Sequence, residues 1–134
     1  MKKSIWLVLS LLLVLFTATA ASAECTVMPR YAYVSEISSS LSISSGTARA
    51  VGVIATDQNL KTSIIVRLQR EYSSGKWTTI STWTGSNESG NSEAGGSKAL
   101  TSGYNYRVYV TGKVYNSAGT VIETVEKYST TKLY

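Results

Sequence analysis

Acidic side chains are present in this 134-residue chain, but histidine is absent. Histidine supplies the commonest general base and the commonest metal ligand, so its absence excludes Ser-His-Asp and Cys-His nucleophile systems. Catalysis would have to come from carboxylates. The chain has one aspartate, Asp57, and seven glutamates: Glu24, Glu36, Glu71, Glu88, Glu93, Glu123 and Glu126.

Two glutamate pairs are close enough in sequence to be weighed as a general acid and base. Glu123 and Glu126 have opposite parity on a strand, so they would point to different faces of a sheet. Glu88 and Glu93 fall within residues 85–97, a glycine-rich stretch that predicts a long mobile loop without core residues. Such a loop would not hold a two-carboxylate glycosidase geometry. We predict no catalytic residue and a protein that is not an enzyme.

The same loop offers oxygen ligands for a calcium ion. Asn87, Glu88, Asn91 and Glu93 are of the right chemical type, but their spacing follows no calcium-binding pattern. The favoured interpretation is a solvated loop with no metal and no other cofactor.

Binding is the chemistry that remains. The outward parity of a strand expected at residues 104–115 gathers Arg107, Tyr109, Lys113 and Tyr115, and Arg67 and Gln69 would lie beside them on a neighbouring strand. Tyrosine offers rigid contact area and arginine offers directional donors, so this face suits a glycan or a protein. The competing interpretation is a solvated sheet face.

The elements that would position these residues are β-strands. Apolar and polar residues alternate in segments separated by glycine, serine and asparagine clusters, and no helical period is visible after the first 23 residues. Six strands are expected, at residues 38–45, 47–55, 61–71, 77–84, 104–115 and 120–129, with a ragged edge strand at the end of the 85–97 loop as a seventh.

Parity assigns the faces of these strands. One face of the central strand carries Tyr106, Val108 and Val110, which predicts a core face, and Val51, Val53 and Ala55 share one face of an earlier strand. Trp77 and Trp83 have one parity and Ile80 the other, so both faces could meet the core only if a bulge intervenes. About seven short strands predict an all-β, two-sheet antiparallel Ig-like sandwich, and an open barrel is the runner-up.

Residues 1–23 have the three parts of a cleavable secretory signal peptide. A pair of lysines opens the chain, residues 5–16 form an apolar run of about a dozen residues, and small residues end the segment. The run is shorter than the roughly 18 to 20 residues that span a bilayer. We expect one secreted domain, residues 24–134, without stable membrane insertion.

Cys25 raises the alternative of a bacterial lipoprotein. A lipobox would need a small residue directly before the cysteine, and Glu24 stands there, so we expect a lone thiol. Loss of Lys2 and Lys3 with the signal peptide leaves 11 basic against 8 acidic residues, a net charge near +3. The basic residues are scattered singly, which argues against a nucleic-acid partner.

The segment from Leu100 to Val108 resembles the part of fibronectin type III domains where a leucine, a turn and a tyrosine six residues on form a tyrosine corner. Tyr106 matches that tyrosine, and Trp77 with its preceding turn matches an earlier strand. The resemblance covers about residues 61–129 and implies a core tyrosine whose hydroxyl bonds back to the backbone. Ser102 stands where the family has proline.

The whole chain is similar to small exported proteins of spore-forming Gram-positive bacteria that form a family without an assigned activity. The residues that carry this resemblance are the signal peptide, Tyr-x-Tyr at 31–33, Leu-Ser-Ile-Ser-Ser-Gly-Thr-Ala at 41–48 and Gly-Tyr-x-Tyr-Arg-Val at 103–108. The leading hypothesis is a secreted, non-enzymatic binding or adhesion module for a cell-envelope or host glycan or protein. The alternative is an exported toxin or bacteriocin-like protein acting on membranes or competing cells.

Overall fold

The computed structural model describes residues 30–134, so the predicted signal peptide, its cleavage site and Cys25 lie outside the described residues. Every regular element in the described part is a β-strand. The strands are β1 (Val34–Ser44), β2 (Thr47–Thr56), β3 (Lys61–Ser73), β4 (Lys76–Asn87), β5 (Ser92–Ala99), β6 (Asn105–Tyr115), β7 (Val121–Tyr128) and β8 (Lys132–Leu133).

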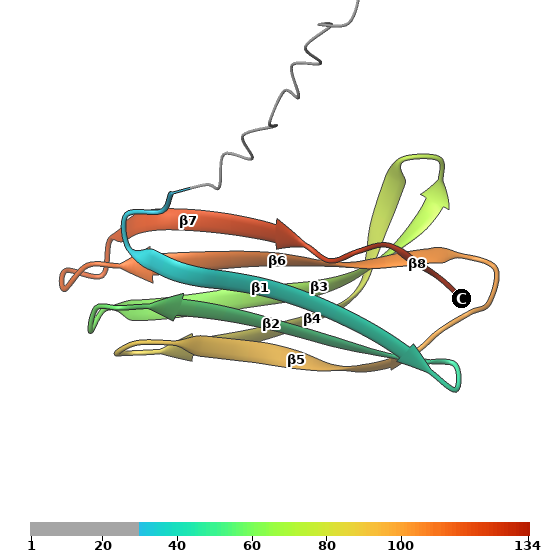
Figure 1. Cartoon of the computed structure of the whole chain (residues 1–134), viewed down its shortest axis with the longest axis horizontal. Coiled ribbons are helices and arrows are strands. Elements are labelled where there is room, and N and C mark those ends of the chain that lie inside the picture. Colours follow the sequence, from blue (N-terminus) through green and yellow to red (C-terminus); the bar gives the residue numbers. More distant parts are fainter. Residues whose placement is uncertain (1–29) are drawn as a thin grey trace, which may run out of the picture.

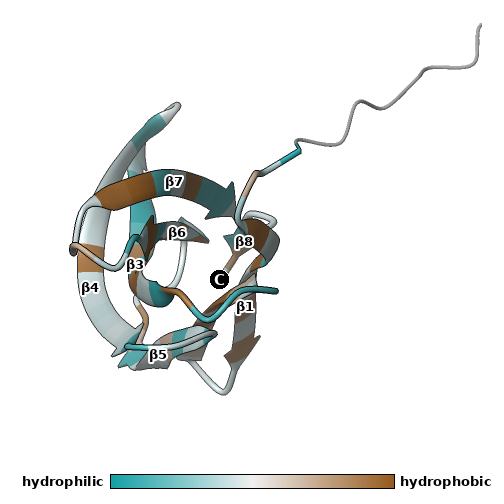
Figure 2. Cartoon of the chain, turned by 90° about the vertical axis from the view of Figure 1, so that its left-hand side faces the viewer, coloured by the Kyte–Doolittle hydropathy of each residue, from teal (hydrophilic) through white to brown (hydrophobic). Residues whose placement is uncertain are grey.

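The strands form two antiparallel sheets, one with the order β1-β2-β5 and one with the order β4-β3-β6-β7. The short strand β8 also pairs with β6. The first sheet lies in front of the second in Figure 1, and Figure 2 looks along the strands and shows the two layers around the interior. The predicted all-β, two-sheet antiparallel fold is confirmed.

The core lies between the sheets and follows the predicted alternation. On β3 the buried apolar side chains are Ile64, Val66 and Leu68, and on β6 they are Tyr106, Val108, Val110 and Val114. Burying one such aliphatic side chain contributes about 1.5–3 kcal/mol. This central pair of strands therefore fixes which residues of the second sheet face outward.

The Tyr106 side chain makes the predicted contact with the backbone. Its ring is fully buried, and its hydroxyl donates to the Thr101 carbonyl oxygen at 2.6 Å and accepts from the Thr101 amide at 3.1 Å. The turn before β6 is thereby tied to the core.

The face of β2 that carries Val51, Val53 and Ala55 is the outer, half-buried one. The core face carries Ile54 and, toward the start of the strand, the small residues Ala48, Ala50 and Gly52. A Cβ at Gly52 would lie 2.7 Å from a Val66 methyl group and 2.8 Å from a Val110 methyl group. Small residues face inward here because the opposite sheet approaches closely.

The prediction of a long loop without core residues at residues 85–97 is wrong, although the edge strand expected at its end is present as β5. β4 continues to Asn87 and β5 begins at Ser92, and both Ser92 and Ala94 are buried. A Cβ at Gly85 would overlap the Glu93 carbonyl group on the opposite sheet edge. This glycine permits close approach of two strand backbones and does not mark a loop.

A bulge on β4 places its two tryptophans on opposite faces. The register with β3 shifts between Leu68 and Gln69, which leaves Ile80 as the extra residue. Trp83 and Ile80 pack against the core, and Trp77 lies on the outer face. The tip of the β3–β4 hairpin stands clear of the sandwich in Figure 1.

Candidate functional site

The six residues of the predicted binding face lie on β3 and β6, which are neighbouring strands. Arg67 is paired with Tyr109 and Gln69 with Arg107, while Lys113 and Tyr115 continue the same parity along β6. All six are half-buried, and the residues that alternate with them on β6 are buried. The structure thus places the whole set on the outer face of the larger sheet.

The set is divided into two groups along that face. Arg67, Gln69, Arg107 and Tyr109 lie together, whereas Tyr115 is six residues from Tyr109, or about 20 Å along an extended strand. The two tyrosines do not form one contact surface.

The first group belongs to an alternating arrangement that we call the arginine–aromatic row: Trp77, Arg107, Tyr128, Tyr109 and Arg67. The Arg107 guanidinium carbon lies 4.2 Å from the centre of the Trp77 ring and 4.3 Å from that of Tyr128. Tyr128 is stacked on Tyr109 with ring centres 4.6 Å apart and an angle of 12° between the planes. Arg67 completes the row at 5.4 Å from the Tyr109 ring.

Hydrogen bonds fix the orientation of the row. The Arg107 Nε donates to Gln69 Oε1 at 2.8 Å, and an Arg67 terminal nitrogen donates to Thr111 Oγ1 at 3.0 Å. The Tyr109 hydroxyl donates to Glu126 Oε1. This hydrogen bond to the carboxylate raises the pKa of Tyr109 above its ordinary value.

The positive charges of the row are not neutralised by direct ion pairs. Within residues 30–134 the only ion pair joins Lys61 and Glu88, and neither Arg67 nor Arg107 has a carboxylate oxygen within 4.0 Å. Glu71 lies nearby, but its carboxylate accepts from the Asn105 side chain and the Gly75 amide. These two hydrogen bonds, with a smaller contribution from the charge of Arg107, lower the pKa of Glu71.

The second group surrounds Tyr115. Its hydroxyl lies 3.0 Å from the Ser63 hydroxyl, and Lys61 Nζ lies 5.8 Å from the centre of its ring. Lys61 also contacts Glu88 at 2.9 Å, which raises the pKa of the lysine. The charge of Lys61 is therefore balanced by Glu88, and Lys113 lies opposite Ser63 at the same end of the face.

Sequence reasoning missed four residues of the site: Trp77, Thr111, Glu126 and Tyr128. The turn at residues 116–119 does not by itself place Tyr128 opposite Tyr109, because the register between β6 and β7 shifts between Val114 and Tyr115. Trp77 could be assigned to the face only with the Ile80 bulge in place, and no residue pattern locates that bulge.

Several of the oxygen atoms considered for acid chemistry or calcium have hydrogen-bond partners in the fold. The Glu123 carboxylate accepts from the amides of residues 32–34. The Asn91 side-chain oxygen accepts from the Thr56 amide, and the Asn87 side-chain oxygen accepts from the Ser89 amide. In the part of the chain that the structure describes, no group of three or more His, Cys, Asp or Glu side chains could hold a metal ion.

Comparison with protein-family models, with curated proteins and with solved structures finds no match for this chain. The fold defines the class of the protein as a two-sheet all-β sandwich. No helix among residues 30–134 is long and apolar enough to cross a membrane.

Proposed function

We propose that the mature chain, residues 24–134, is a secreted, non-enzymatic binding or adhesion module that uses the arginine–aromatic row as its recognition surface. The observation that supports this function is the pair of row arginines, which are held by aromatic rings on an outer sheet face without a carboxylate partner. The partner is a cell-envelope or host glycan or protein that carries negative charge.

The row is organised before a ligand arrives. Arg107 is confined between two rings and by its bond to Gln69, so little side-chain entropy remains to be lost on binding. Stacking occupies the faces of a guanidinium group, whereas its N–H donors lie in the plane and match carboxylate, phosphate or sulfate oxygens. Tyr128, with 48% of its surface exposed, adds contact area beside these donors.

Stacking also stabilises the sheet, and this role alone could account for the row. A cation–π contact at an exposed site contributes about 0.5–1 kcal/mol to stability. Stabilisation and recognition can be told apart by measurement. If the row is a recognition surface, substitutions in it reduce ligand affinity by more than their effect on stability explains.

A binding screen of the mature protein tests the proposal. The panel contains acidic and neutral glycans, acidic proteins and an envelope extract, and each ligand that binds is titrated with Arg107→Ala and Tyr128→Ala. We expect an acidic ligand whose affinity falls about 5- to 30-fold in each variant, the range of a moderate interface contact of 1–2 kcal/mol. Ser40→Ala, on the exposed face of the other sheet, is the matched control. Unchanged affinity in both row variants would contradict the proposal.

Secretion is tested separately by the mass of protein recovered from the medium. Cleavage after the small residues 21–23 gives a chain that begins at Glu24. A diacylglyceryl adduct on Cys25 would contradict the lipid-free form.

We also propose a relationship to fibronectin type III domains. It is supported by the buried Tyr106 hydroxyl bound to Thr101 and by the separation of the β1-β2-β5 sheet from the β4-β3-β6-β7 sheet. The resemblance to exported proteins of spore-forming bacteria stays a prediction.

A further inference from the structure

A second surface of a different character lies where the edges of the two sheets meet. An open groove of about 670 Å³ runs between β4 and β5. Its volume is in the range of small-molecule sites, roughly 300–1,000 Å³. The groove and the arginine–aromatic row have no residue in common and approach each other only at β4, where Thr82 is paired with Arg67.

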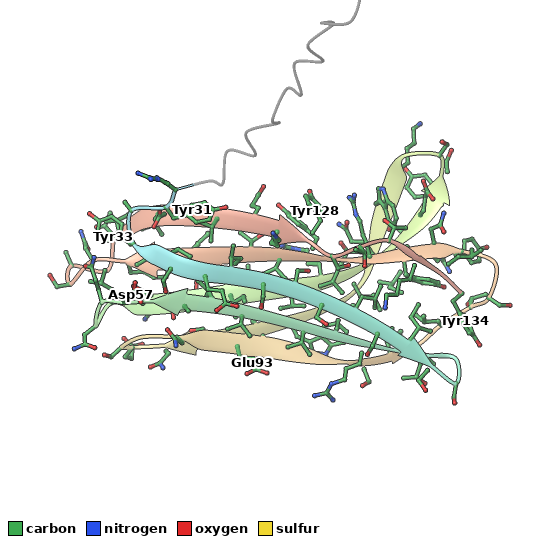
Figure 3. The ribbon with its side chains drawn as sticks, in the orientation of Figure 1. Tyr31, Tyr33, Asp57, Glu93, Tyr128 and Tyr134 are labelled. Atoms are coloured by element: carbon green, nitrogen blue, oxygen red, sulfur yellow. The ribbon has the colours of Figure 1, made fainter. Side chains whose placement is uncertain are left out.

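The floor of the groove carries opposite charges at its two ends. Arg49 is paired with Ser97, Val51 with Gly95, and Val53 with Glu93. Arg49 and the Glu93 position are therefore four residues apart along the strands, or about 13 Å. Val51 and Gly95 lie between them, and Gly95 has no Cβ, which lets its backbone lie close to that of Ala50 on β2. Figure 3 shows Glu93 projecting from β5, on the other sheet from Tyr128.

Trp83 forms one wall. Its indole ring lies directly against Gly96, where a Cβ atom would overlap the indole nitrogen. The ring also packs against the core, so its position is fixed, yet it remains half-buried and lines the groove. The exposed residues Thr82 and Thr84 flank it on the outer face of β4 and add hydroxyl groups.

We propose that this groove binds one or two sugar residues within an uncharged glycan chain. A fixed indole offers an apolar surface to the C–H groups of a pyranose ring, as in other ligand sites that combine an aromatic surface with a few polar groups. Arg49 supplies N–H donors, Glu93 supplies acceptors, and the threonines supply both for sugar hydroxyls. The charges of Arg49 and Glu93 cancel, which favours a neutral ligand over an anion. The groove is open along the surface, which suits a chain that continues beyond it.

This site does not depend on the proposed role of the row, and the two tryptophans separate the two surfaces experimentally. The sequence has three tryptophans, and the predicted mature chain keeps only Trp77 and Trp83. Their indole N–H signals in a nitrogen-labelled sample report the row and the groove respectively.

The test titrates the labelled mature protein with cellohexaose, maltohexaose, chitohexaose and mannohexaose, and with a neutral serine–glycine peptide. We expect at least one oligosaccharide to shift the Trp83 indole signal and to leave that of Trp77 in place. Glu93→Gln and Arg49→Ala should each weaken that binding at least 5-fold, whereas Glu36→Gln, at an exposed glutamate on β1, should not. These exposed positions leave the core intact, and Trp83→Phe serves as a further variant.

The proposal is overturned if no oligosaccharide in the series shifts the Trp83 signal, or if a bound oligosaccharide is unaffected by both Glu93→Gln and Arg49→Ala. Binding of the peptide alone also overturns it, because the groove would then recognise a polypeptide. If the groove binds no oligosaccharide, the proposal that the arginine–aromatic row binds an acidic ligand still stands. That proposal is tested independently with Trp77 and Arg107.

Discussion

The Arg107 guanidinium carbon lies 4.2 Å from the centre of the Trp77 ring, although these residues belong to β6 and β4 and β3 runs between those strands. The contact crosses the central strand diagonally and depends on the Ile80 bulge, which puts Trp77 on the outer face. A local irregularity in one edge strand thus completes the arginine–aromatic row.

The Trp77–Arg107 contact should contribute measurable coupling to stability. We expect a double-mutant cycle with Trp77→Ala and Arg107→Ala to give an interaction free energy of about 0.5–1 kcal/mol in urea unfolding. The control pair is Trp77→Ala with Ser40→Ala, which belong to different sheets and should be additive. An interaction free energy of zero between Trp77 and Arg107 would mean that the stacking is absent in solution.

Tyr106→Phe should destabilise the protein more than Tyr109→Phe. The first change leaves the Thr101 amide and carbonyl without their hydroxyl partner next to the core, at a cost of about 1–3 kcal/mol. The second removes only an exposed bond to Glu126, which should cost less than about 1 kcal/mol. Urea melts give both values, and the reverse order would show that Tyr109 is the better buried of the two.

The hydroxyl of Tyr109 should lose its proton at a higher pH than that of an ordinary tyrosine, whose pKa is about 10. The Glu126 carboxylate accepts a hydrogen bond from the phenol hydroxyl and thereby favours the neutral form of Tyr109. The contribution of this hydrogen bond to folding stability is complete below the pKa that Tyr109 has in the unfolded chain. It is lost as the pH rises through the higher pKa that Tyr109 has in the folded protein. Titration of the labelled Tyr109 ring by NMR measures this, and Glu126→Gln should lower the pKa. A pKa that Glu126→Gln leaves unchanged would rule out the bond.

Gly85→Ala should destabilise the sandwich because the new methyl group would overlap the Glu93 carbonyl across the seam between β4 and β5. The expected cost is about 1–3 kcal/mol, typical of overpacking. Ser86→Ala, at the next position and exposed, should change stability by no more than about 0.5 kcal/mol. Equal melting temperatures for the two variants would show that the backbones of β4 and β5 are further apart at Gly85 than the structure places them.

The sequence predicted the strands with clear alternation because each buries one face. Along β3 and β6 a period of two residues specifies both the core set and the outward set, so all six residues of the predicted face were placed on the correct side. The same spacing puts Tyr115 about 20 Å along the strand from Tyr109, a distance that the prediction of one shared face did not take into account.

Two features were hidden because they depend on tertiary contacts. Gly85, Gly95 and Gly96 have the composition of a loop, but all three are required by close contacts between strands. Gly85 and Gly95 lie against neighbouring backbone, and Gly96 lies against the Trp83 ring. The bulge at Ile80 likewise satisfies packing on both sides of β4. Single-residue patterns contain neither contact. The edge strand expected at the end of the loop was therefore placed too late and made too short, and the face of Trp77 could not be predicted.

The most direct test of the central claim is nitrogen-resolved NMR of the mature protein titrated with the acidic glycans and acidic proteins that it retains in the binding screen. The row as recognition surface predicts that these ligands shift the Trp77 indole and Arg107 Nε signals together, and that Arg107→Ala weakens binding about 5- to 30-fold, equivalent to 1–2 kcal/mol. Acidic ligands that bind without moving either signal, or a screen in which no acidic ligand is retained, would contradict it.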